Sequence, residues 1–186
     1  MNIGLDIDDT MTNSSELMIK YAKKYFNTTD EEVINKLLHT KMSKEEVFDF
    51  YNQYLPELMG KYELKENVKE VIDNLRIKGH KIIIITARGR TIKKGLEEIT
   101  KKYLKKHKIE VDDMIFGEVD KAAICLENNI DIMIDDSIAI LEKVKASGIK
   151  PLLFSSISNQ TSDTNIDRVN NWIELETYID NIYSYQ

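Results

Sequence analysis

Residues 81–86 read Lys-Ile-Ile-Ile-Ile-Thr, with four isoleucines in a row between two polar residues. A β-branched run without alternating polar positions is typical of a strand that is buried on both faces, as in a parallel sheet. Short apolar runs recur near residues 3–6, 114–116, 132–134 and 152–154, and amphipathic stretches of helical spacing separate them. Strands that alternate with helices of about 10–15 residues indicate βα units. The sequence therefore predicts an α/β fold in which a parallel sheet carries helices on both faces.

Residues 13–77 interrupt this alternation, because their apolar residues recur at helical spacing only. The first helix of this stretch is expected to follow Ser14 or Ser15, one of which would be its N-cap. We expect residues 13–77 to form a small all-helical cap subdomain, inserted after the first strand at the edge of the sheet. Residues 1–12 and 78–186 are expected to form the α/β core domain.

The composition limits the classes of protein to which the chain can belong. Of its 186 residues, 42% are hydrophobic, which is enough for a sizeable core. The net charge of −6, from 26 Lys and Arg against 32 Asp and Glu, argues against a binder of nucleic acid or anionic membranes. The single cysteine, Cys125, excludes an internal disulfide and a thiolate zinc cluster. Without a visible signal peptide or an apolar run of about 20 residues, we expect a cytoplasmic protein.

Polar residues stand at the carboxyl ends of three predicted strands. The set comprises Asp6, Asp8, Asp9 and Thr10 after the first strand, Thr86 after the second, and Asp135, Asp136 and Ser137 after the fourth. Lys121 opens the helix that follows the third strand. Because ligands of an open parallel sheet bind beyond the carboxyl ends of its strands, we expect these side chains to converge on one site.

The chemistry of this set favours a divalent cation and a phosphate. Several carboxylates in one crevice repel each other, which raises their pKa values unless a cation is present. Oxygen ligands with no paired His or Cys nearby favour Mg²⁺ over zinc. A divalent ion, one lysine and a threonine hydroxyl suit an anionic substrate, since phosphoryl transfer depends mainly on charge neutralisation and positioning.

Four motifs resemble those of the haloacid dehalogenase (HAD) superfamily and occur in the same order. They are Asp6-Ile-Asp8-Asp9-Thr10, Thr86-Ala87-Arg88, Lys121, and Ile134-Asp135-Asp136. The resemblance implies a Rossmann-like, HAD-like core, and the helical insert is similar to the first type of cap in that superfamily. The Asp-Asp pair, the small cap and the Thr-Ala-Arg sequence look most like the 5′(3′)-deoxyribonucleotidase branch and related bacterial nucleotidases.

The resemblance implies a role for each carboxylate. Asp6 would be the nucleophile that forms an aspartyl-phosphate, and Asp8 would act first as an acid and then as a base. Mg²⁺ would be held by Asp6, by Asp8 through its backbone carbonyl, and by Asp135. Asp136 would help to hold the metal directly or through water, or would instead cap a helix. Asp9 stands where the superfamily often has glycine, and it is expected to serve a turn or a helix cap.

The same resemblance implies that Thr86, Ala87, Arg88 and Lys121 bind the substrate phosphate. For Arg88, and for Arg90 two residues later, a solvated position in the loop is an equally open alternative.

These observations predict a Mg²⁺-dependent phosphomonoester hydrolase that works through an aspartyl-phosphate, with nucleoside monophosphates as the first candidates. A HAD phosphatase for another small phosphorylated metabolite stays open, as does a phospho-aspartate signalling or binding module without turnover. The expected partner is a small phosphorylated substrate, not nucleic acid or a membrane. The oligomeric state is open, with a homodimer as one option. Most aromatic residues of the cap are expected to form its core, and Phe48 and Tyr51 are the candidates for contact with the substrate.

Overall fold

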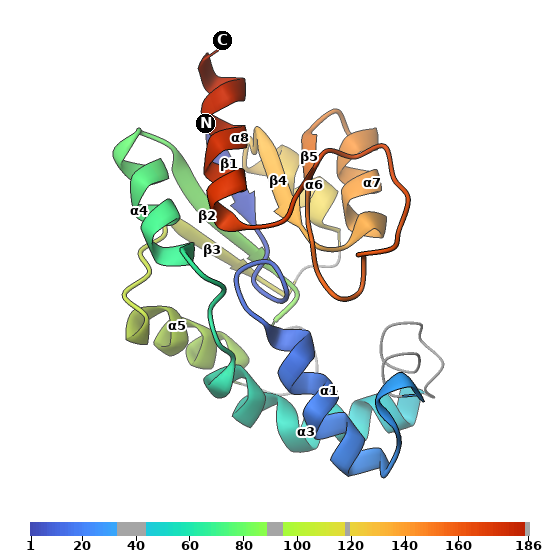
Figure 1. The fold of residues 1–186 in the computed structure, drawn as a ribbon. Coiled ribbons are helices and arrows are strands. Elements are labelled where there is room, and N and C mark those ends of the chain that lie inside the picture. The colour runs from blue at the N-terminus through green and yellow to red at the C-terminus, as the bar shows by residue number, and fades with distance from the viewer. Residues whose placement is uncertain (33–43, 89–94, 118–119, 185–186) are drawn as a thin grey trace.

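A computed structural model describes residues 1–32, 44–88, 95–117 and 120–184 of the chain (Figure 1). Within these ranges six strands form one sheet in the order β3-β2-β1-β4-β5-β6, and all neighbouring strands are parallel. The strands are β1 (Asn2–Leu5), β2 (Lys81–Thr86), β3 (Asp113–Phe116), β4 (Ile132–Asp135), β5 (Lys150–Phe154) and β6 (Arg168–Val169). The predicted α/β fold with a parallel sheet is confirmed.

The helices divide into a group around the sheet and a group apart from it (Figure 1). The described helices are α1 (Ser14–Phe26), α3 (Lys44–Lys61), α4 (Val68–Ile77), α5 (Leu96–Lys106), α6 (Lys121–Glu127), α7 (Ile138–Ala146) and α8 (Trp172–Ser184). In Figure 1, α1 and α3 lie side by side below the strands and α5 lies next to α3, while α4, α6, α7 and α8 lie around the sheet. Every helix in the described ranges is too short or too polar to cross a lipid bilayer.

The isoleucine run of β2 is buried on both faces, as its sequence predicted. Ile82 and Ile84 belong to one apolar cluster together with residues of α4 and α8. Ile83 and Ile85 belong to the second cluster, together with residues of α6 and α7. Because successive side chains of a strand point to opposite faces, this division means that helices cover both sides of the sheet.

The two ends of the helical insert meet beside the first strand. Thr12 and Leu64 form an antiparallel β-bridge. On either side of this bridge, the Asn13 amide donates to the Glu63 carbonyl and the Lys65 amide donates to the Met11 carbonyl, both at 2.9 Å. The chain thus leaves the core and returns to it at neighbouring points.

Helix α4 packs on the sheet, although it falls inside the 13–77 segment. Its buried residues Val68, Val71, Ile72 and Leu75 join the apolar cluster that contains β1 and α8. We therefore propose that the cap ends near Leu64 and that α4 is counted with the core. The cap proper would then hold α1 and α3, whose aromatic rings pack together, for example Tyr25 against Phe50 with ring centroids 5.6 Å apart.

Two local expectations differ from the structure. Neither Ser14 nor Ser15 is the N-cap of α1, because Ser14 is already the first helical residue and Asn13 holds the N-cap position. Strand β6 was not expected, since two residues are too few to give a periodic pattern.

Candidate active site

The order of the strands decides which predicted residues meet. Strand β1 lies between β2 and β4, so the carboxyl ends of these three strands share one edge of the sheet. Asp6 directly follows β1, Thr86 is the last residue of β2, and Asp135 is the last residue of β4. The Asp6 amide continues the sheet by donating to the Ile134 carbonyl at 3.0 Å. Because the strand order reverses direction at β1, this edge is where an open α/β sheet offers a ligand site.

Lys121 joins the ends of β1 and β4. As the first residue of α6, it places its Nζ 2.5 Å from Asp6 Oδ1 and 2.6 Å from Asp135 Oδ2. The side chain of Lys121 is only 3% exposed, so this ammonium is held by two nearly buried carboxylates. Burial lowers the pKa of Lys121, but the two carboxylates more than offset it and hold the pKa above its ordinary value. Lys121 therefore stays charged.

Three carboxylates form a group that could hold a cation. Asp6, Asp135 and Asp136 each offer an oxygen, and these oxygens lie within 4.8 Å of one another. Burial raises the pKa of Asp136 to about 8, with further contributions from the charges of Asp135 and Asp6. Burial likewise raises the pKa of Asp6, and the opposing effect of Lys121 does not cancel it. A hard divalent cation would relieve this repulsion, and an all-oxygen donor set fits Mg²⁺.

The loop after β5 supports Asp136. Asp136 Oδ2 accepts hydrogen bonds from the hydroxyls of Ser156 at 3.0 Å and Ser158 at 3.2 Å. The side-chain amide of Asn159 donates to the carbonyls of Asp136 and Phe154, both at 2.8 Å. These three polar residues were not among those predicted for the site. They could have been found from their position after β5, because this strand is parallel to β4 and ends at the same edge of the sheet.

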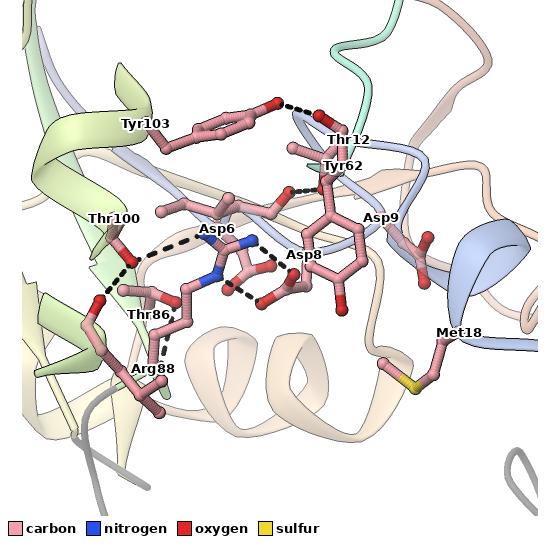
Figure 2. Close-up of polar contacts among 12 residues, drawn as sticks. Asp6, Asp8, Asp9, Thr12, Met18, Tyr62, Thr86, Arg88, Thr100 and Tyr103 are labelled. Carbon is pink, nitrogen blue, oxygen red and sulfur yellow. Dashed lines mark hydrogen bonds and ion pairs between the residues drawn. The ribbon is translucent and has the colours of Figure 1, made fainter. Parts of the chain in front are cut away.

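Asp8 is bound by Arg88 and not by the acidic group (Figure 2). Arg88 Nε donates to Asp8 Oδ2 at 2.9 Å and Arg88 Nη2 donates to Asp8 Oδ1 at 2.7 Å. Desolvation in the crevice raises the pKa of Asp8, but the ion pair with Arg88 outweighs it and holds the pKa below its ordinary value. Arg88 is itself buried, so the alternative of a solvated loop position is wrong for this residue. Arg90 lies outside the described residues.

Asp9 fixes the start of α1. Its φ of 58° lies in the left-handed region that glycine adopts freely and that Asp tolerates better than most residues. Its carboxylate accepts hydrogen bonds from the amide of Ser15, at 2.8 Å, and from the hydroxyl of the same residue. Asp9 thus serves as the cap that the sequence analysis had placed at Ser14 or Ser15. The next residue, Thr10, accepts a hydrogen bond at its carbonyl from Trp172 Nε1 of α8 at 3.2 Å.

The predicted phosphate-binding residues occupy two different surroundings. Thr86 is buried at the end of β2, where its hydroxyl oxygen accepts a hydrogen bond from the Arg88 amide at 3.3 Å. Ala87 is exposed in the turn between them. Lys121 contacts Asp6 directly, whereas the guanidinium of Arg88 contacts Asp8. Their binding of phosphate stays a prediction.

Two tyrosines of the cap segment approach Asp8. Tyr62, which follows α3, lies with its ring centroid 5.6 Å from the guanidinium carbon of Arg88. Tyr51 of α3 is half-buried, and its hydroxyl donates to the sulfur of Met18 at 3.5 Å. Burial raises the pKa of Tyr51, and the charges of Asp8 and Asp9 add to this effect. Tyr51 was a predicted candidate for contact with the substrate and Tyr62 was not. The side chain of Phe48, the other candidate, lies outside the described part of the structure.

Comparison with solved structures defines the class of the fold. A structure titled "Crystal structure of a predicted phosphatase from Clostridium acetobutylicum" matches with a TM-score of 0.71 at 17% identity, over 97% of this chain and 98% of that one. A haloacid dehalogenase-like hydrolase from Streptococcus pneumoniae, SP0104, matches with a TM-score of 0.68 at 14% identity, over 96% and 97% of the two chains. The fold is therefore that of the HAD hydrolases.

Comparison of sequences gives the family within that class. Residues 1–184 match the model of the family described as 5′ nucleotidase, deoxy (Pyrimidine), cytosolic type C protein. The Bacillus subtilis (strain 168) protein named "Putative nucleotidase YqfW" is 31% identical over 191 residues, which cover 97% of this chain and 94% of that protein. The chain belongs to this 5′ nucleotidase family and is a hydrolase of the HAD phosphatase type. The predicted superfamily and the prediction of an enzyme are confirmed.

Proposed function

We propose that the protein is a Mg²⁺-dependent phosphomonoester hydrolase that uses Asp6 as its nucleophile, with nucleoside monophosphates as substrates. The observation that carries this proposal is the position of Asp6. Its carboxylate is bonded to the buried ammonium of Lys121 and lies within 4.8 Å of ligand atoms of Asp135 and Asp136. A nucleophile, a fixed positive charge and a candidate metal site therefore share one edge of the sheet, as phosphoryl transfer requires.

In the first step, an oxygen of the Asp6 carboxylate attacks phosphorus. Lys121 holds Oδ1 at 2.5 Å, and the described residues give Oδ2 no hydrogen-bond donor, so Oδ2 is the oxygen that we assign to the attack. The bond from phosphorus to the ester oxygen breaks, and the leaving alcohol takes a proton from Asp8, which has to bind that proton before the step, against the effect of its ion pair with Arg88. The product of this step is an aspartyl-phosphate on Asp6.

In the second step, water hydrolyses the aspartyl-phosphate. Asp8 takes the proton of the attacking water, the acyl-phosphate bond breaks, and inorganic phosphate leaves with the Asp6 carboxylate restored. Arg88 keeps Asp8 in one orientation through two hydrogen bonds, and it favours the ionised form that this step needs. We assign Arg88 to Asp8 first, and to the substrate phosphate only secondarily.

Mg²⁺ would be held by Asp6, Asp135 and Asp136, and by the backbone carbonyl of Asp8. When bound, it would supply charge neutralisation for the phosphate oxygens and the developing negative charge. Thr86 would donate its hydroxyl to a phosphate oxygen, because that hydroxyl uses only its acceptor side within the described residues. Lys121 and the amide of Ala87 complete the proposed phosphate site.

Two observations support nucleotides over other phosphomonoesters. The family description names a 5′ nucleotidase, and the relative from Bacillus subtilis carries a nucleotidase name. Tyr51, a half-buried residue of the cap segment near Asp8, also offers an aromatic ring on which a flat base could stack. A small sugar phosphate or another phosphorylated metabolite is the second candidate. A cytoplasmic location agrees with a nucleotide substrate.

Phosphate release from a panel of nucleoside monophosphates, sugar phosphates and phenyl phosphate tests this proposal. We expect turnover with Mg²⁺, none with EDTA, and a loss of at least about 1,000-fold in Asp6→Asn. Asp73→Asn is the matched control, because that carboxylate pairs with Lys69 on the surface of α4. Denaturation during turnover of a radiolabelled nucleotide should trap label on the wild-type protein in a bond that hydroxylamine cleaves. Equal turnover in Asp6→Asn would overturn the nucleophile assignment.

A further inference from the structure

Tyr62 carries a buried hydroxyl that the proposed mechanism does not use. The residue is 3% exposed, and within the described part of the chain its hydroxyl has no hydrogen-bond partner. A buried polar group without a partner costs about 1–3 kcal/mol, so native proteins rarely keep one without a reason. A phenylalanine at this position would avoid that cost with almost the same shape.

The position of Tyr62 is fixed by a contact to its ring and by a hydrogen bond to its backbone. The face of the ring lies 5.6 Å from the guanidinium carbon of Arg88, which is within the range of a cation–π contact. Arg88 is itself fixed by its two hydrogen bonds to Asp8. The backbone carbonyl of Tyr62 accepts a hydrogen bond from the Tyr103 hydroxyl at 2.9 Å. The position of the unpartnered hydroxyl is therefore set before any ligand binds.

The hydroxyl lies on the side of Asp8 that faces the cap. Figure 2 shows the Tyr62 ring beside the Asp8 carboxylate, with its hydroxyl end between Asp8 and Met18, a residue of α1. Burial raises the pKa of Tyr62, and the nearby charge of Asp8 raises it further, so the phenol stays protonated and can donate a hydrogen bond. Asp8 is the group that would protonate the leaving oxygen, so a donor next to it faces the alcohol part of the substrate.

We propose that Tyr62 is a substrate-binding residue whose hydroxyl, buried in this structure, becomes accessible when the substrate enters and donates a hydrogen bond to a second oxygen of the leaving alcohol, close to the ester oxygen. The inference rests on the proposed phosphatase function. The chemical class that fits is a phosphomonoester of a polyhydroxylated or cyclic-ether alcohol, such as the sugar of a nucleoside monophosphate. Phenyl phosphate has no second oxygen in its leaving group, and it should not use this donor.

Tyr62→Phe removes only the hydroxyl and keeps the ring on Arg88. We expect kcat/KM for a nucleoside monophosphate to fall about tenfold or more, which is the effect of losing one buried hydrogen bond to the substrate. For phenyl phosphate, kcat/KM should change less than about twofold. The melting temperature should stay the same or rise, because the variant loses an unpaired buried group. A merely structural role predicts the opposite change in stability.

Tyr178→Phe is the matched control, since its hydroxyl donates to Asp167 at 2.6 Å on the surface. We expect this variant to keep its activity on both substrates and to lose a little stability. Unchanged nucleotide kinetics in Tyr62→Phe, or an equal loss on phenyl phosphate, would overturn the assignment of Tyr62.

A binding measurement separates this inference from the proposed function. Calorimetry in the Asp6→Asn background compares the Kd of a nucleoside monophosphate with and without Tyr62→Phe, and it does not depend on turnover. A Kd weakened about tenfold for the nucleotide and unchanged for phenyl phosphate supports the role of Tyr62. An equal Kd for the nucleotide overturns it, even if turnover is found. Tight nucleotide binding without turnover by the wild-type enzyme would overturn only the proposed function.

Discussion

The guanidinium of Arg88 forms two hydrogen bonds with the carboxylate of Asp8. This contact favours a role in positioning Asp8 over a role in binding the substrate phosphate, and the sequence alone did not distinguish the two. An arginine after β2 can reach either the phosphate or a neighbouring carboxylate, because both lie beyond the end of the sheet. In the structure both oxygens of Asp8 accept from Arg88. The positive charge of the paired Arg88 guanidinium also lowers the pKa of Asp8. Arg88 is therefore expected to affect the proton-transferring group more than the affinity for substrate.

Replacement of Arg88 by lysine separates these roles. Lysine keeps the positive charge but cannot form the two-point contact, so Asp8 should lose its fixed orientation. We expect kcat for a nucleoside monophosphate to fall about 10- to 100-fold, since misplacement of a reacting group by about 1 Å has effects of that size. KM should change by less than about threefold. Steady-state kinetics of Arg88→Lys measure both values.

Arg76→Lys is the control for this measurement, because Arg76 pairs with Glu110 on the surface. A large rise of KM in Arg88→Lys, with kcat unchanged, would favour the phosphate-binding role that the family resemblance implied.

Residues that follow buried strands were the predictable part of the site. Asp6, Thr86 and Asp135 could be placed together because parallel strands end at a common edge, and that rule needs no side-chain coordinates. Tyr62 could not be placed, since it follows a helix of the insert and its relation to Arg88 depends on how the cap sits on the core. The contact between Arg88 and Asp8 could not be predicted either, because the directions of side chains in a loop follow no regular period.

At the scale of single elements, α1 shows how a loop residue can replace a predicted cap. Ser14 and Ser15 looked like capping residues because of their type and their place before an apolar face. The structure gives this task to Asp9, which reaches the Ser15 amide from outside the helix. The expectation that Asp9 serves a turn or a helix cap is confirmed, whereas the expectation that Ser14 or Ser15 is the N-cap is wrong.

Substitutions of Asp9 measure the two functions of this residue separately. Asp9→Gly removes the cap and keeps the left-handed backbone at no cost, so we expect a loss of about 1 kcal/mol in the free energy of unfolding. Asp9→Ala adds the cost of a left-handed residue that carries a Cβ, about 1 kcal/mol more. Urea unfolding of both variants measures the difference. Equal stability of the two would contradict the left-handed conformation at position 9.

The strands were predicted more closely than the helices, and the reason is burial. A strand covered on both faces is a continuous apolar run, and β2 has the bounds that its sequence gave. Helix α4 was predicted as part of the insert because its amphipathic pattern resembles that of a cap helix. Pattern alone does not say which apolar surface the helix covers, and α4 covers the sheet.

At the scale of the whole molecule, the acidic edge of the sheet should make stability depend on pH and on metal. Asp136 has a pKa of about 8 in the folded protein, compared with the ordinary value of 3.8 that applies to the unfolded chain. Between these values the folded chain binds a proton that the unfolded chain has released. Stability of the metal-free protein therefore falls as the pH rises through this window, and it is greatest at the acidic side.

Thermal unfolding in EDTA should follow this dependence, with a lower melting temperature at about pH 9 than at about pH 5.5. Added Mg²⁺ should raise the melting temperature more at the higher pH, because it binds the ionised carboxylates. Asp136→Asn should flatten the pH dependence of the metal-free protein, and Asp73→Asn should not. A melting temperature that rises with pH in EDTA would contradict the raised pKa of Asp136.

The bridge between Thr12 and Leu64 has a consequence for how such an enzyme can change over evolution. The chain departs and returns at adjacent positions, so an insertion of another length or shape at this place would leave the strand order untouched. Selectivity for the alcohol can then diverge by exchange of one segment, while the groups that act on phosphorus are inherited unaltered. One hydrolytic centre can in this way be offered to many metabolites.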